Sequence, residues 1–135
     1  MSIEQRIRES FAQQSMMQTF GAEVVSVAEG EVVLRAPILD LAKQQMGFAH
    51  AALTFALGDT AAGYAALTTL PEGQEVVTAE IKINLLSPAT GDWLEARGRV
   101  VKPGRRLVVV SAVVEAVSGA TRKEVALLQG SMMPI

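Results

Sequence analysis

Hydrophobic and polar residues follow two periods along the chain, one helical and one of two residues. Apolar residues recur at helical spacing over 3–11, and Ser2 with Gln5 resembles a capping box, so a short amphipathic helix is predicted there. In residues 47–70 apolar side chains would occupy every side of a helix, which is typical of a buried helix. We therefore expect one small surface helix and one long buried helix.

Most of the remaining chain alternates apolar and polar residues, as half-buried strands do. Residues 23–28 and 31–38 flank a Glu-Gly turn and predict an antiparallel hairpin. Residues 39–49 show no clear period and are expected to form a loop into the buried helix. Four further strands are expected over residues 77–85, 93–101, 107–117 and 122–132.

The strands after the buried helix define the predicted fold class. Short turns join them, and Pro103-Gly104 suits the two centre positions of a type II turn. Residues 107–117 are nearly all Val and Ala, so this strand is expected to be covered on both faces. Because strands joined by short turns are antiparallel, the chain predicts an α+β domain in which a meander curls around the helix. A length of 135 residues fits one domain, 1–135.

Composition narrows the class of protein further. Hydrophobic residues make up 50% of the chain and charged residues 19%, which suggests that another subunit covers part of the surface. We therefore expect a homo-oligomer. The formal net charge of −2 disfavours a general nucleic-acid binder, which needs a basic excess to neutralise phosphates.

Cysteine and histidine usage limits the possible chemistry. The chain has no cysteine and one histidine, so disulfides and thiolate catalysis are excluded and no metal site is expected. The charged N-terminal residues lack the apolar core of a signal peptide, and no segment reaches about 18 uninterrupted apolar residues. The expectation is a soluble, cytoplasmic protein with no membrane partner.

One carboxylate, Asp59, lies alone in the middle of the apolar stretch. Burying it without a partner would cost several kcal/mol, so its presence needs a reason. It could cap a second helix that begins after a break at Gly58. Alternatively, it could be held in an apolar cleft as a general base or nucleophile. The spacing alone favours neither interpretation.

His50 lies at the expected start of the buried helix. A lone histidine there is commonly structural, but the free N–H groups of Ala51 and Ala52 suit a carbonyl oxygen or oxyanion. Ala51 precedes Asp59 by eight residues, which is roughly 12 Å along a helix and too far for both to touch one reacting carbonyl. If they cooperate, they come from two chains of a symmetric dimer with antiparallel helices.

Basic residues concentrate late in the chain, with six of the twelve Lys and Arg between Lys82 and Arg106. A solvated sheet face is one explanation. The other is a patch that binds a phosphorylated ligand such as the nucleotide end of coenzyme A. No glycine-rich phosphate loop, Ser-His-Asp arrangement or HExxH motif is evident.

Gln44, Gly47, His50 and Asp59 fall in the register of a known motif: Asn or Gln, Gly, His-Gly-Gly and an acidic residue nine positions after the histidine. In this respect the chain resembles the hotdog-fold acyl-CoA thioesterases of the phenylacetate-degradation type. Thr60 and the alanine after it also match the family's common Asp-Thr-Ala sequence. The similarity extends to a long strand ending in proline and to the next hairpin, so it covers roughly residue 44 to the C-terminus.

The resemblance implies a hotdog fold, with the sheet wrapped around the helix, and hydrolysis of a small aromatic or short- to medium-chain acyl-CoA at a dimer interface. Asp59 would activate water or attack the thioester carbon, the Ala51 N–H would polarise the carbonyl, and Gln44 would orient the water or thioester. Further substrate contacts are expected at Gly47, His50, Thr60, Arg105 and Arg106. It implies no cofactor beyond the coenzyme A of the substrate, and dimers that pair into tetramers.

The chain departs from the motif where His-Gly-Gly has become His50-Ala51-Ala52. Each added methyl could crowd the approach of the acyl carbonyl, although alanine retains the N–H and suits helical angles. A non-catalytic hotdog module that binds acyl-CoA is therefore the alternative. A dehydratase of the same fold would need His50 beside an acid at the reacting carbons.

Overall fold

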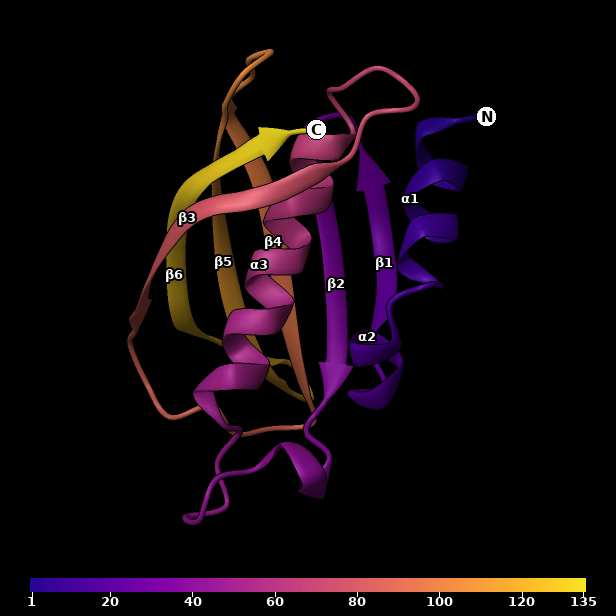
Figure 1. Cartoon of the computed structure of the whole chain (residues 1–135). Coiled ribbons are helices and arrows are strands. Elements are labelled where there is room, and N and C mark those ends of the chain that lie inside the picture. Colours follow the sequence, from indigo (N-terminus) through magenta and orange to yellow (C-terminus); the bar gives the residue numbers. More distant parts are fainter.

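A six-stranded antiparallel sheet curves around one long helix in the computed structural model, which describes residues 1–135 (Figure 1). The helices are α1 (Ile3–Phe11), α2 (Ser15–Thr19) and α3 (Ala51–Leu67), with a short 3₁₀ turn, η1 (Asp40–Ala42). The strands are β1 (Glu23–Ala28), β2 (Glu31–Pro37), β3 (Val76–Leu85), β4 (Trp93–Lys102), β5 (Val108–Ser118) and β6 (Thr121–Pro134). This is the predicted α+β hotdog fold. None of the helices is both long and apolar enough to cross a membrane.

The strand order is β1-β2-β4-β5-β6-β3, so the predicted meander is correct only in part. Strands β4, β5 and β6 follow one another as expected, and β1 and β2 form the predicted hairpin. Strand β3, however, pairs with β6 rather than with β4, and β4 pairs with β2. The connection over residues 86–92 is longer than a tight hairpin turn and carries the chain across to β2. As a result, β3 becomes an edge strand.

The long helix α3 runs without interruption for 17 residues. Its N-cap is His50, whose Nδ1 accepts a hydrogen bond of 2.8 Å from the N–H of Ala52. Gly58 does not break the helix but lets it pack closely on the sheet, because a Cβ there would lie 2.8 Å from Leu128 Cδ1. The interpretation of Asp59 as the cap of a second helix is therefore wrong.

Helix α1 begins at the predicted capping box, in which Ser2 and Gln5 exchange side-chain to backbone hydrogen bonds. It also fastens the far end of α3. The Arg6 guanidinium donates hydrogen bonds of 2.8, 2.9 and 2.7 Å to the carbonyl oxygens of Leu70, Pro71 and Gln74. It also lies 3.5 Å from the carbonyl oxygen of Leu67, the last residue of α3. Because the last carbonyl groups of a helix lack partners within it, Arg6 supplies a charged donor where α3 ends and the following turn begins.

The alternation predicted for β3 is interrupted by a bulge. Thr78 pairs with Met132 and Glu80 pairs with Ser131, which leaves Ala79 without a partner. The extra residue changes the face to which the side chains point. Thr78 therefore faces α3, on the same side as the apolar side chains that β3 packs against the core further along.

Two smaller expectations also need correction. Gly104 does not have the positive φ required at the third position of a type II turn. It permits a close approach instead, because a Cβ there would lie 2.2 Å from the Leu107 carbonyl oxygen. Strand β5 is fully covered only on the side facing α3, where alternate residues are buried, while the residues between them are half-buried.

Candidate functional site

Asp59 lies in the middle of α3 and faces the edge strand β3. It is half-buried, and its Oδ1 accepts a hydrogen bond of 2.7 Å from the Thr78 hydroxyl. No Lys, Arg or His forms an ion pair with the carboxylate. The sequence pattern did not predict Thr78 at this site, since a strict two-residue period places it on the opposite face from Ile81 and Ile83. Only the bulge in the pairing with β6 turns it toward Asp59.

A cavity of about 320 Å³ opens beside Asp59. It extends along α3 and is bordered by β3, by Met132 of β6, by Ser10 of α1 and by Gln14 between α1 and α2. Its lining residues are Ser10, Gln14, Asp59, Thr60, Gly63, Tyr64, Leu67, Glu75, Val76, Thr78 and Met132. The predicted contact residue Thr60 therefore lies beside Asp59. The residues from the first 14 positions were not predicted, because nothing in their local pattern relates them to the helix.

A hydrogen-bonded cluster centred on Tyr64 forms one side of this cavity. The Tyr64 hydroxyl accepts a hydrogen bond of 2.8 Å from Gln14 Nε2 and lies 3.0 Å from Ser10 Oγ. Burial raises the pKa of Tyr64 above 10.0, the hydrogen bonds from Ser10 and Gln14 oppose this shift, and the charge of Glu75 adds to it. The phenol is therefore a neutral hydrogen-bonding group at physiological pH.

Gln44 lies in a second cavity, of about 490 Å³, at the other end of α3. Its side-chain Oε1 accepts hydrogen bonds of 2.5 and 3.2 Å from the N–H groups of Met46 and Phe48. Within this loop Gly47 adopts φ +86°, a conformation that glycine reaches without steric cost. These contacts fix the amide plane of Gln44 and leave its NH₂ group free to donate.

The first N–H group of α3, that of Ala51, opens on the same cavity as Gln44. It has no hydrogen-bond acceptor in the chain, whereas the N–H of Ala52 is taken by His50. Of the two predicted donors, only Ala51 is thus available to an outside group. His50 acts as the helix cap, as the structural interpretation expected, and no carboxylate forms an ion pair with it.

One chain does not bring the predicted catalytic groups together. Ala51 and Asp59 are separated by eight residues on a continuous helix, which corresponds to roughly 12 Å. The cavity beside Asp59 and the cavity beside Gln44 share no lining residue. In Figure 1 the start of α3 lies toward the lower end of the molecule. Each half of the predicted site is therefore present, but the halves are apart.

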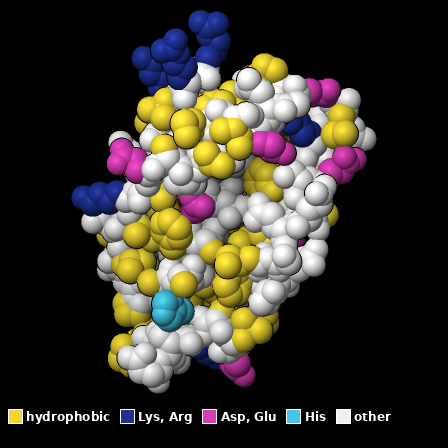
Figure 2. Space-filling view, viewed as in Figure 1, with side chains coloured by type: hydrophobic (Ala, Val, Ile, Leu, Met, Phe, Trp, Pro, Cys, Tyr) yellow, Lys and Arg dark blue, Asp and Glu magenta, His cyan; other side chains and the backbone are white.

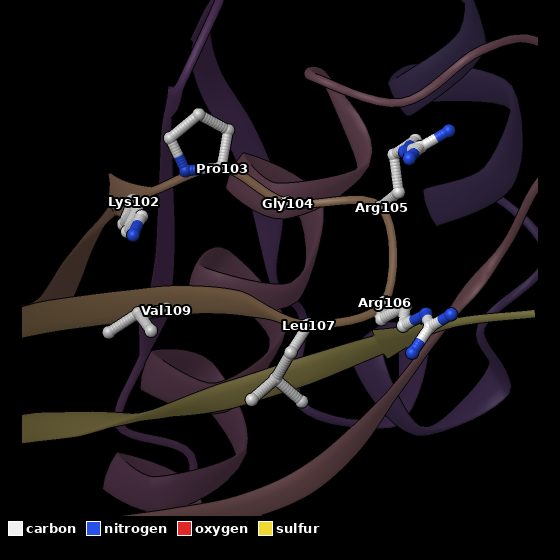
Figure 3. Close-up of a pocket in the computed structure, with 7 residues that line it drawn as sticks. All are labelled: Lys102, Pro103, Gly104, Arg105, Arg106, Leu107 and Val109. Atoms are coloured by element: carbon white, nitrogen blue, oxygen red, sulfur yellow. The ribbon is translucent and has the colours of Figure 1, made fainter.

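The predicted phosphate contacts, Arg105 and Arg106, lie in the loop between β4 and β5. With Lys102 they border an open hollow of about 730 Å³, and their side chains extend away from the loop (Figure 3). None of the three forms an ion pair. The loop lies at the end of the molecule opposite the start of α3 (Figures 1 and 2). Within one chain it is therefore remote from Gln44.

Other basic residues in the same part of the sequence belong to the solvated face of the sheet. Arg97 and Arg99 of β4 both contact the Glu31 carboxylate of β2. The hydrogen bond from Arg97 holds the pKa of Glu31 below its usual value, and the charges of both arginines add to this effect. The surface interpretation of the basic residues is thus correct for these two. The other four form no ion pair: Lys82 lies on β3, and Lys102, Arg105 and Arg106 lie at the β4–β5 loop.

Comparison with known proteins now identifies the family. The model of the thioesterase superfamily matches residues 46–123, which is more than half of the chain. The chain belongs to the thioesterase superfamily. It is also 31% identical over 104 residues to a protein of Saccharolobus solfataricus whose name assigns it provisionally to the esterases; the match covers 77% of this chain and 69% of that protein.

Solved structures of similar proteins share the fold of this thioesterase-superfamily chain. A thioesterase family protein from Silicibacter pomeroyi is 36% identical with a TM-score of 0.96, covering 99% of this chain and 98% of that one. A protein from Bacillus halodurans, solved with coenzyme A, is 26% identical with a TM-score of 0.78, covering 98% and 83%. The hotdog arrangement of sheet and helix is therefore that of known thioesterases.

Proposed function

We propose that this thioesterase-superfamily protein hydrolyses acyl-CoA thioesters at a site built from two copies of the chain. The observation that carries the proposal is the division of the site. Asp59 and the unpartnered N–H of Ala51 open on separate cavities of one chain, although the motif requires both at one carbonyl. The motif at Gln44, Gly47, His50 and Asp59 supports the phenylacetate-degradation type, with small aromatic or short- to medium-chain acyl groups. The relative solved with coenzyme A supports that carrier.

A symmetric homodimer would join the two halves. Strand β3 lies at the edge of the sheet, and its backbone groups are unpaired on one side. It also exposes apolar side chains, with Val77 42% and Leu85 54% exposed, and such an edge is a template for strand pairing. If two copies pair along β3 about a two-fold axis, their α3 helices run in opposite directions. The start of one α3 then lies beside Asp59 of the other.

In this dimer the residues take complementary roles. The N–H of Ala51 in one chain donates to the thioester carbonyl oxygen and stabilises the oxyanion as it forms. In one route, Asp59 of the other chain removes a proton from water while the water oxygen attacks the carbonyl carbon. In the other route, the Asp59 carboxylate attacks that carbon directly. In the first route the carbon–sulfur bond then breaks, the leaving thiolate takes the proton that Asp59 accepted, and the carboxylic acid is released. In the second route the break leaves a mixed anhydride between the acyl group and Asp59 and a thiolate that takes a proton from water; a second water hydrolyses the anhydride to the carboxylic acid and restores the Asp59 carboxylate.

Gln44 completes the arrangement by donating from its NH₂ group to the water or the thioester, because its Oε1 is already occupied. The two-fold axis also moves the β4–β5 loop of one chain to the end at which α3 of the other begins. We assign the phosphates of coenzyme A to Arg105 and Arg106, because in this dimer they lie at the same end as the second cavity and neither forms an ion pair within the chain.

The test is thiol release from acyl-CoA by the variants Asp59→Asn and Gln44→Ala, alone and mixed. Each variant alone should fold and dimerise but lose turnover. After the two are unfolded and refolded together, half of the dimers are hybrids with one intact site of two, so about a quarter of the wild-type rate should return. Wild-type turnover by Asp59→Asn would refute the role of the carboxylate, and no recovery on mixing would refute the two-chain site.

A second candidate is a module that binds acyl-CoA without hydrolysing it. It is favoured by the Ala51 and Ala52 methyl groups, which stand where the family motif has two glycines and are both exposed. Tight binding of acyl-CoA with no release of free thiol would identify this function. Under that function, Ala51→Gly should create hydrolysis. If the wild-type protein is already an efficient hydrolase, the methyl groups do not block the carbonyl.

A further inference from the structure

Gly63 occupies an unusual position, in the interior of the long helix and one turn after Asp59. Glycine is among the least favourable residues for a helix interior, because it loses the most backbone freedom on folding. A helix that retains a glycine there has a packing reason, a conformational reason or a functional one. Each can be tested on the structure.

Packing and backbone conformation do not explain Gly63. A Cβ built at this position would meet only Met132 Cε and Sδ at 3.9 Å and Val76 Cγ2 at 4.0 Å, which are ordinary van der Waals distances. Its φ is not positive. Two other glycines, which lie where α3 packs on the sheet, differ from Gly63. A Cβ at Gly58 would lie 2.8 Å from Leu128 Cδ1, and a Cβ at Gly98 would lie 2.3 Å from the Ala61 carbonyl carbon. Close packing therefore explains those two glycines but not Gly63.

The cavity beside Asp59 does account for it. Gly63 and the two residues nearest its absent side chain, Val76 and Met132, all line this cavity, so a side chain at position 63 would occupy its space. The cavity measures about 320 Å³, which is near the lower end for ligand pockets, and a few added atoms would consume a large part of it.

We propose that Gly63 determines the largest acyl group that the protein accepts, by keeping the cavity beside Asp59 open. This inference rests on the proposed function. When the thioester carbon lies against Asp59, the acyl group enters the cavity that contains Asp59, while the coenzyme A portion extends toward the second cavity. Gly63 is then a specificity-determining residue that does not touch the reacting atoms.

The test compares wild type, Gly63→Ala and Gly63→Leu on acetyl-, hexanoyl-, decanoyl- and phenylacetyl-CoA. Acetyl-CoA hydrolysis should persist in both variants. For the largest group that wild type accepts, kcat/KM should fall about tenfold with alanine and further with leucine, since small changes in pocket volume have effects of this size. Gly63→Ala should also raise Tm by a few degrees, because alanine suits the helix better.

A control separates this effect from general disturbance. Ser111→Val adds bulk on the outer face of β5, away from the cavity, and should leave the order of acyl preference unchanged. The inference is overturned if the Gly63 variants lower kcat/KM equally for every substrate, or if they leave the order of acyl preference unchanged. It is also overturned if Gly63→Ala fails to fold, since position 63 then has no open space beside it. If wild type hydrolyses none of the thioesters, the proposed function itself has failed. Asp59-dependent hydrolysis with an unchanged profile defeats only the role of Gly63.

Discussion

The hydroxyl of Thr78 donates a hydrogen bond of 2.7 Å to Oδ1 of Asp59 and so joins the edge strand β3 to the middle of α3. This contact exists because the bulge at Ala79 changes the face to which Thr78 points. It fixes the orientation of the carboxylate and leaves Oδ2 free for another hydrogen bond. Thr78 is therefore a positioning residue for the proposed base or nucleophile.

Replacing Thr78 by valine keeps its shape but removes the hydroxyl. The carboxylate can then rotate, and we expect kcat to fall roughly 10- to 100-fold because small misplacements of a reacting group have effects of this order. KM should change little, since Thr78 is not proposed to bind coenzyme A. Thr78→Ser should restore most of kcat. Steady-state kinetics of thiol release measures both parameters, and an unchanged kcat in Thr78→Val would contradict the positioning role.

Arg6→Ala should destabilise the fold markedly. The variant leaves three carbonyl oxygens near the end of α3 without a charged donor, and hydrogen bonds to charged groups are worth about 1.5–3 kcal/mol each. Because water can replace part of this, we expect a total loss of about 2–3 kcal/mol in the free energy of unfolding. Urea denaturation measures it. The matched control is Arg99→Ala, whose exposed contact with Glu31 at 3.6 Å should contribute less than about 1 kcal/mol.

Tyr64 should make the fold sensitive to alkaline pH. Its pKa in the folded chain is raised above the ordinary value of 10.0, so the folded state retains the phenol proton where the unfolded state loses it. The stabilisation is fully present below pH 10.0 and is lost as pH rises through the folded pKa. Since Tyr64 is the only tyrosine, ultraviolet titration of tyrosinate reports on it alone. Urea unfolding of Tyr64→Phe across the same pH range should lack this loss.

Charge in the cavity beside Asp59 should select against anionic acyl groups. The cavity is lined by two carboxylates, those of Asp59 and Glu75, and by no Lys or Arg. Glu75→Gln should raise the ratio of kcat/KM for succinyl-CoA to that for butyryl-CoA by up to about fivefold, since an exposed charge contact is worth up to ~1 kcal/mol. Glu72→Gln removes an exposed carboxylate outside the cavity and should leave the ratio unchanged. Equal ratios in wild type and Glu75→Gln would rule out this selection.

The parts of the fold that depend on local pattern could be predicted from the sequence. The buried helix follows from its all-round apolar composition, and the motif from Gln44 to Asp59 lies within one segment of the chain. The separation of Ala51 from Asp59 also followed from helix geometry once the helix was known to be continuous.

Features that depend on pairing between distant segments could not be predicted. Thr78 faces Asp59 because the pairing of β3 with β6 shifts register at Ala79. The sequence of β3 alone predicts a regular strand without this shift. The place of β3 at the edge of the sheet is likewise set by where β4 finds its partner. Ser10 and Gln14 approach the cavity only because α1 packs against β1 and brings their side chains to Tyr64 of α3, and their own residue types carry no such signal.

The bulge at Ala79 has a consequence for solubility as well as for chemistry. An edge strand that is regular and apolar along its whole length invites successive copies to stack on it and aggregate. The bulge at Ala79 bends and twists β3, so its exposed edge is not regular along its whole length. The irregularity that aims one hydroxyl at a carboxylate is thus compatible with a single, closed two-fold pairing of β3 in the proposed dimer but disfavours open-ended fibre growth.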